Sequence, residues 1–253
     1  MPSQEEQPQL VKIAEGLYVR QEVDNIGWAD MGEGILVVDA LEQVHLEDEV
    51  MAMMEDSVPG KKVDTVLNTH THYDHVALNK AFEKKHGAKI VNLQTTDVPE
   101  KGLVIAGAGR TCRFIPMPGC HTREDCIAWF AEDRTLFVGD LFGWGLITSM
   151  TSATRDVMTG LESVYNRLID FGAETVVPGH GPLCSNAELV RCRAYYDWLA
   201  GEVYNAFDAG KKLPDIITDI PVPDDMNDWW RLCDWKHEQN IRKLFKGARR
   251  HRA

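Results

Sequence analysis

The sequence predicts an α+β protein in which two β-sheets pack face to face and helices cover their outer sides. Short apolar runs typical of buried strands alternate with helix-like amphipathic segments in two consecutive rounds. From residue 187 onward the pattern is helical, with interruptions near Pro214 and residues 221–223. We therefore expect a sandwich domain over residues 1–185 and a helical C-terminal extension over residues 186–253 that packs on it.

The first round is predicted from apolar patterning. Residues 10–14 and 17–23 form a hairpin around the turn Glu15-Gly16, and continuous apolar runs mark buried strands. The helix expected before the fourth strand has Val44, Val50, Met51 and Met54 on its apolar face. The predicted elements are strands at 10–14, 17–23, 34–38, 63–67 and 89–93, with helices at 44–55 and 76–86.

The second round and the extension follow from the same patterns. The predicted elements are strands at 112–117, 126–130, 136–138 and 175–177, with an amphipathic helix at 157–171. In the extension, helical spacing places apolar side chains on two stripes, Leu189, Tyr196, Leu199 and Val203, then Trp229, Leu232, Trp235 and Ile241. We expect the cluster of Trp229, Trp230 and Trp235 to dock the last helix on the core.

The composition argues against some classes of binding partner. The 253 residues carry 27 basic and 39 acidic side chains, a net charge of −12 that repels phosphate backbones and anionic membranes. Residues 1–9 lack the pattern of a signal peptide, and no apolar run approaches the ~20 residues of a membrane span. Six cysteines form no CxxC pair, so a structural zinc knuckle is not expected. We expect a cytoplasmic protein that acts on a small molecule.

The strongest functional signal is the hexapeptide His70-Thr-His72-Tyr-Asp74-His75, directly after a predicted buried strand. His70 and His72 alternate by two, so an extended segment points both to one side, where they can share a metal. Asp74 and His75 follow the turn of the chain and can serve a second metal. Imidazole and carboxylate ligands suit zinc, with iron or manganese as substitutes.

Three later positions each follow an apolar strand. His121 comes after Pro118-Gly119, Asp140 after Gly139, and His180 after Pro178-Gly179. Singly, each is more typical of a turn residue or a strand-end cap. Together they supply what the hexapeptide lacks, a third imidazole for each metal and a carboxylate to bridge them.

The motifs from Gly34 to Gly181 resemble those of the metallo-β-lactamase superfamily and occur in the same order. They are Asp39, HxHxDH, PG-x-H, GD and PGHG. The resemblance implies an αββα metallo-β-lactamase sandwich with a site along one edge of both sheets. It also implies the ligand sets, His70, His72 and His121 on one metal, Asp74, His75 and His180 on the other, with Asp140 bridging. Asp39 would steady the HxHxDH loop from behind.

Some relatives within the superfamily fit less well. Flavodiiron oxygen reductases have glutamate at the position of His72, and zinc β-lactamases usually have cysteine at that of Asp140 and are exported. The segment after Asp140 also differs from that of persulfide dioxygenases. The chain itself departs from many members at residues 76–78 and 123–125, where they have glycines. Substrate analogies with any one subfamily are weakened accordingly.

The implied reaction is hydrolysis of a small ester, thioester or lactone. Two zinc ions would hold a bridging hydroxide, which Asp74 orients, and would polarise the attacked carbonyl. Open alternatives are an iron-dependent redox enzyme with the same ligands, a phosphoester hydrolase, and a binding protein without turnover. Side chains in or near the motif loops, Trp28, Tyr73, Phe142 and Trp144, are candidates either for a substrate pocket or for ordinary core. We expect the extension to form a wall of the pocket, to cover a sheet or to form a homodimer contact. We expect Cys120 to be a packed thiol.

Overall fold

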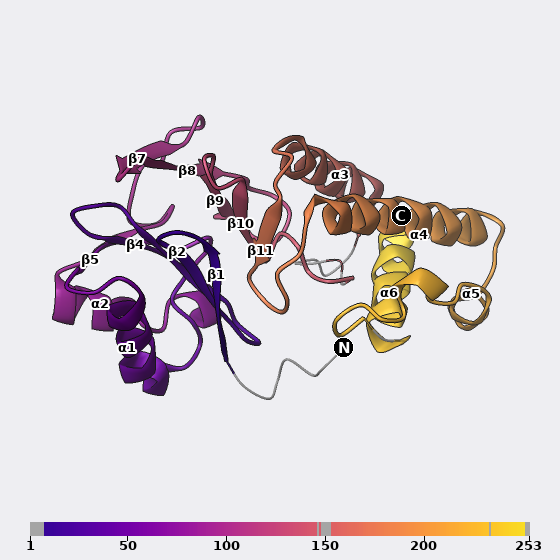
Figure 1. The fold of residues 1–253 in the computed structure, drawn as a ribbon. Coiled ribbons are helices and arrows are strands. Elements are labelled where there is room, and N and C mark those ends of the chain that lie inside the picture. The colour runs from indigo at the N-terminus through magenta and orange to yellow at the C-terminus, as the bar shows by residue number, and fades with distance from the viewer. Residues whose placement is uncertain (1–7, 146, 148–152, 233, 251–253) are drawn as a thin grey trace.

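The computed structural model describes residues 8–250 except residues 146, 148–152 and 233. Its first sheet has six strands in sequence order (Figure 1). The first four pair antiparallel, and the last two add in parallel. The strands are β1 (Gln9–Ala14), β2 (Leu17–Gln21), β3 (Ile26–Asp30), β4 (Ile35–Val38), β5 (Val63–Leu67) and β6 (Lys89–Val91).

The second sheet has five strands in the order β11-β10-β9-β8-β7. Only β10 and β11 pair in parallel, because α3 connects them, while the other neighbours are antiparallel. The strands are β7 (Leu103–Gly107), β8 (Arg110–Pro116), β9 (Cys126–Phe130), β10 (Thr135–Gly139) and β11 (Thr175–Pro178).

The two sheets face each other across an apolar layer. Leu36 and Leu67 of the first sheet share this layer with Phe114 and Phe137 of the second. The sheets approach so closely at Gly27 that an added Cβ would lie 2.2 Å from a ring carbon of Phe137. This arrangement confirms the predicted α+β sandwich.

Two further apolar clusters join helices to the outer sides of the sheets. Helices α1 (Glu47–Ser57) and α2 (Asn79–His86) cover the first sheet. Helix α3 (Arg155–Asp170) and the extension cover the second (Figure 1). The third cluster is continuous from β8–β11 into the extension, so extension and sandwich share one core.

The extension folds into three helices, α4 (Asn186–Asp208), α5 (Leu213–Asp219) and α6 (Asp234–Arg250). Ser185 and Glu188 form a capping box that fixes the start of α4. Pro214 occupies the first turn of α5, where its missing N–H costs nothing, so it begins a helix. No helix in the described part of the chain has the length and apolarity needed to cross a membrane.

Several local expectations were wrong. Val44 lies in a short 3-10 turn before α1 and is 61% exposed, so it is not part of that helix's apolar face. Helix α2 begins at Asn79, three residues later than predicted, because the chain first turns through the motif loop. Trp235 is 61% exposed and docks nothing inside the core. Strands β3 and β7 were not predicted, since each is short and contains glycine.

Candidate metal centre

The predicted ligands lie on loops at the carboxyl ends of four strands. His70, His72, Asp74 and His75 follow β5, and the other three side chains follow β8, β10 and β11. Strands β8 and β10 both pair antiparallel with β9, and β11 is parallel to β10. These three strands therefore run the same way, and their carboxyl ends meet at one edge of the sheet.

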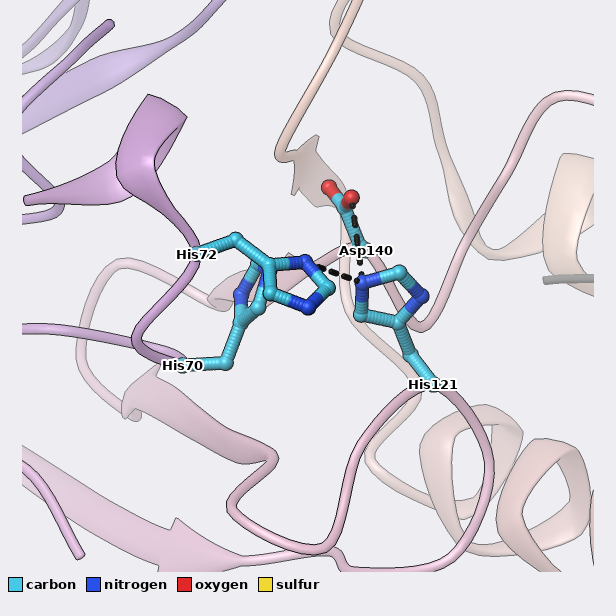
Figure 2. A group of neighbouring side chains, drawn as sticks. All are labelled: His70, His72, His121 and Asp140. Carbon is cyan, nitrogen blue, oxygen red and sulfur yellow. Dashed lines mark hydrogen bonds and ion pairs between the residues drawn. The ribbon is translucent and has the colours of Figure 1, made fainter. Parts of the chain in front are cut away.

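The first group consists of His70, His72, His121 and Asp140, which offer donor atoms within 4.8 Å of one another. Figure 2 shows the three imidazoles and the carboxylate converging. His121 Nε2 lies 3.0 Å from His72 Nδ1 and 3.5 Å from Asp140 Oδ2. Nitrogen and oxygen donors from three loops thus surround one point.

The second group consists of Asp74, His75, His180 and again Asp140. His180 Nε2 lies 3.2 Å from Asp74 Oδ2 and 3.3 Å from Asp140 Oδ1, and His75 Nε2 lies 3.4 Å from the same Asp140 oxygen. Asp140 therefore directs one carboxylate oxygen toward each group. The structure thus brings together all seven side chains that the sequence nominated.

The donor atoms fit a pair of metal ions. Among the described residues, His70 Nε2 is buried and has no hydrogen-bond partner, while His75 Nε2 and Asp140 Oδ1 are buried and make ion-pair contacts but no hydrogen bond. A buried polar atom without a partner costs roughly 1–3 kcal/mol, which a bound cation would remove. Sites rich in imidazole and carboxylate suit zinc, iron or manganese.

Buried carboxylates hold the ligand loops from behind. Asp39 Oδ1 accepts a hydrogen bond from Thr69 N at 2.7 Å, and Asp39 Oδ2 lies 3.0 Å from His75 Nδ1. Asp39 itself adopts φ +61°, a left-handed conformation that is uncommon for aspartate. These contacts fit the expected role of Asp39, which is to steady the HxHxDH loop.

Two further orienting carboxylates were not predicted. Asp24 Oδ1 lies 3.0 Å from His180 Nδ1, beside Asn25, whose side chain donates to the backbone oxygens of Pro178 and Gly181. Asp24 belongs to no motif, so only the fold reveals it.

Asp125 fixes the loop of His121. Its Oδ2 accepts hydrogen bonds from His121 N at 2.8 Å and Thr122 N at 2.7 Å. The sequence carries one signal for this role, since residues 123–125 lack the glycine that many family members have there. A carboxylate can accept backbone hydrogen bonds that organise such a turn, which glycine cannot do.

The surroundings of the imidazoles shift their pKa values in opposite directions. Burial, aided by the neighbouring His75, lowers the pKa of His70 to about 2. Burial also opposes protonation of His180, but contacts with Asp140, Asp24 and Asp74 outweigh it and raise its pKa to about 12. The carboxylates around the second group thus create a strongly negative potential, which favours the binding of a proton or a metal ion.

A cavity of about 390 Å³ opens onto both groups. The lining residues include ligands of each group, the predicted aromatic residues Phe142 and Trp144, and a segment of the extension, Trp230, Arg231 and Lys236. No motif marked the last three.

Two predicted pocket residues lie elsewhere. Trp28 is fully buried between the first sheet and α1, where its Nε1 donates to Ser57 Oγ, so it is a core residue. Tyr73 is 68% exposed and is not among the residues that line this cavity. Cys120 is buried in the third apolar cluster, as expected for a packed thiol.

Comparisons with known proteins find similarity to one superfamily. A model of the metallo-beta-lactamase superfamily matches residues 25–107. The beta-lactamase-like protein 2 homolog of Caenorhabditis elegans is 29% identical over 134 residues, 48% of this chain and 43% of that protein. The mitochondrial hydroxyacylglutathione hydrolase of Saccharomyces cerevisiae is 27% identical over 160 residues, 54% and 55% of the two chains. The chain thus spans about half the length of the curated relatives it matches.

Several solved structures are similar over nearly the whole chain. An inverting sec-alkylsulfatase from Pseudomonas superposes with a TM-score of 0.74 at 13% identity, covering 94% of this chain and 50% of that one. At this identity the likeness concerns the fold alone.

Proposed function

Because the chain belongs to the metallo-β-lactamase superfamily, we propose that it is a two-metal hydrolase of small esters, thioesters or lactones. The observation that carries this proposal is the pair of donor groups that share Asp140 and open into one cavity. The similarity to a hydroxyacylglutathione hydrolase favours a thioester within this class.

In this proposal His70, His72 and His121 hold one zinc ion, and Asp74, His75 and His180 hold the other. Asp140, which contacts both groups, would be a ligand shared by the two ions. When bound, such ions polarise a carbonyl oxygen and make water acidic enough to act as a nucleophile near neutral pH.

The chain's own residues position the reactants. Burial opposes ionisation of Asp74, but the contact with His180 and the charge of His75 outweigh it and lower the pKa of Asp74. Asp74 therefore stays ionised near neutral pH and can accept a hydrogen bond from water through Oδ1, which is buried without a partner. Phe142 and Trp144 supply an apolar wall that excludes water from the acyl group.

The test is a substrate panel run on protein reconstituted with zinc. The panel comprises p-nitrophenyl esters, acyl thioesters, homoserine lactones and a chromogenic cephalosporin, with bis-p-nitrophenyl phosphate for the phosphoester alternative. We expect acyl substrates to be hydrolysed and Asp74→Asn to lose most of kcat. Two bound metals without any acyl hydrolysis would contradict the proposal.

The redox alternative is tested on iron-loaded protein. Oxygen consumption with a thiol or NADH as reductant would favour it, whereas zinc-supported acyl hydrolysis without oxygen uptake would exclude it as the main activity. The net charge of −12 makes a phosphodiester in nucleic acid a poor substrate.

A further inference from the structure

A second hollow lies behind one wall of the cavity that opens onto the donor groups. It is a groove of about 610 Å³, whereas the cavity itself measures about 390 Å³. The groove begins close to the metal centre, because its lining residue Pro182 follows soon after the ligand His180. Of the described residues, Trp144 alone lines both hollows. The Trp144 side chain therefore separates the cavity from the groove.

The groove is suited to an apolar chain. The apolar side chains that line it, besides Trp144, are Val11, Ile13, Pro182 and Leu183. Its two charged lining residues are engaged with neighbours. Lys12 Nζ pairs with Glu15, and Glu188 Oε2 accepts hydrogen bonds from the backbone and the hydroxyl of Ser185. A hydrocarbon chain in this groove would thus leave water without leaving either charge unpaired.

Neighbouring aromatic rings hold the Trp144 indole in place. Its centroid lies 5.0 Å from that of Phe142 and 5.3 Å from that of Trp229, and the residue is buried. Trp144 also adopts φ +46°, a left-handed conformation that is uncommon for tryptophan and persists where the surroundings enforce it. The indole is therefore a fixed end wall of the cavity.

Hydrogen bonding does not explain why an indole occupies this position. The Nε1 atom of Trp144 is buried and has no hydrogen-bond partner in the described part of the chain, although a buried indole N–H usually has one. Replacing the indole with a smaller apolar side chain would therefore leave no acceptor unpaired. At this position the shape of the cavity can be changed without breaking a hydrogen bond.

The size of the cavity limits the substrate. Ligand pockets range over roughly 300–1,000 Å³, so a cavity of about 390 Å³ is small. We propose that Trp144 determines the acyl chain length of the substrate, because its indole ends the cavity and keeps the chain out of the groove. The substrate class is thus a short-chain acyl ester or thioester. This inference rests on the proposed hydrolase function.

The first test measures kcat/KM on zinc-loaded protein for N-acetylcysteamine thioesters from acetyl to decanoyl. Each methylene that is buried should raise kcat/KM about fourfold, until the chain reaches the indole. We expect the wild type to have its maximum at a short chain, butanoyl or hexanoyl. Trp144→Ala should shift the maximum to a longer chain and raise the ratio of decanoyl to butanoyl kcat/KM at least about tenfold.

Three further variants sharpen this test. Phe142→Ala removes a ring from the same cavity, but Phe142 is not among the described residues that line the groove, so the maximum should stay at a short chain. Trp144→Ala/Val11→Trp fills the groove from β1 and should restore the wild-type ratio. Trp144→Leu removes less volume and provides the measurement if Trp144→Ala does not fold.

The second test measures binding and needs no turnover. Zinc-loaded protein is titrated in a calorimeter with alkan-1-ols from butanol to decanol. In the wild type, we expect the affinity to stop increasing after the short alcohols. In Trp144→Leu the affinity should continue to increase about fourfold per methylene, because the longer chain now reaches the groove.

The two tests separate the two proposals. An unchanged chain-length maximum in the folded Trp144 variants, with two metals bound, would overturn the role of Trp144 and leave the hydrolase standing. A wild type whose kcat/KM still rises at decanoyl would do the same. No turnover of any thioester with two metals bound would overturn acyl hydrolysis, and the alcohols would still decide whether Trp144 limits the chain length.

Discussion

The edge of the sandwich and the turn Trp229–Leu232, which we call the tail turn, differ in how they are built. The seven donor side chains follow strand ends, and buried carboxylates such as Asp39 and Asp125 hold their loops. The opposite wall of the cavity comes from a half-exposed turn before α6. In the proposed function the chemistry takes place at the sheet edge, and the tail turn forms the wall of the cavity that faces it.

Metal removal should produce the largest effect and act on the first region. A chelator should abolish hydrolysis and lower the melting temperature, because the unfolded chain lacks the assembled site. Metal at a thousandfold excess over its Kd stabilises by about 4 kcal/mol, which corresponds to a shift on the order of 10 °C for a chain of this size. Calorimetry with and without zinc measures it. Full activity with one metal or none by elemental analysis would contradict the two-metal site.

Asp140→Ala and Asp39→Ala should rank next. Asp140 contacts both donor groups, so its loss should lower kcat about a thousandfold or more, since metal chemistry contributes several kcal/mol. Asp39 only orients, and such changes typically cost 10–100-fold. Steady-state kinetics with elemental analysis checks both variants. The reverse ranking would mean that their roles are exchanged.

Asn240→Ala tests the link between the two regions. Asn240, on α6 and fully buried, accepts a hydrogen bond from Ile147 N and donates to Gly145 O and the Tyr195 hydroxyl. Its removal leaves buried backbone groups unpaired and should cost about 2–4 kcal/mol of stability in urea unfolding. The loop after Asp140 should move while both metals stay bound, so the preference among acyl substrates should change. Loss of metal instead would place Asn240 in the metal centre.

The smallest expected effect distinguishes two neighbouring tryptophans. Trp230→Ala removes a ring that lines the cavity and packs on Gly181, and it should change the relative kcat/KM among acyl substrates severalfold. Trp235→Ala is the matched control, because that ring is largely exposed and its loss should change stability by less than about 0.5 kcal/mol. Equal effects of the two substitutions on selectivity would count against a pocket role for the tail turn.

The sequence could predict the donor set because the signals are local. Each ligand lies in the short loop that follows an apolar strand, so strand and ligand are close together in the chain. Asp24 and Lys236 could not be found this way, since each reaches the site only through contacts between distant segments. The family resemblance covered Gly34 to Gly181 and therefore said nothing of the tail turn.

The wrong expectations have a common cause. Trp28 was a candidate for the pocket or the core and lies in the core, whereas Trp235 was expected to dock on the core and is exposed. Aromatic residues suit a core, a cavity and a surface contact alike, so the residue type does not reveal which one applies. Val44 shows that helical spacing is similarly ambiguous. It fits the apolar spacing of α1, but it lies in the 3-10 turn before that helix and not on its apolar face.

The contact between Asp24 and His180 has a consequence for the order in which the chain matures. It joins residues 156 positions apart, and the neighbouring Asn25 side chain donates to Pro178 and Gly181. During synthesis, the HxHxDH loop leaves the ribosome about a hundred residues before His180 does. The second donor group is therefore completed only after both sheets have been made and have met. A metal ion that binds there would therefore be inserted late, after the first sheet has met the last strand of the second.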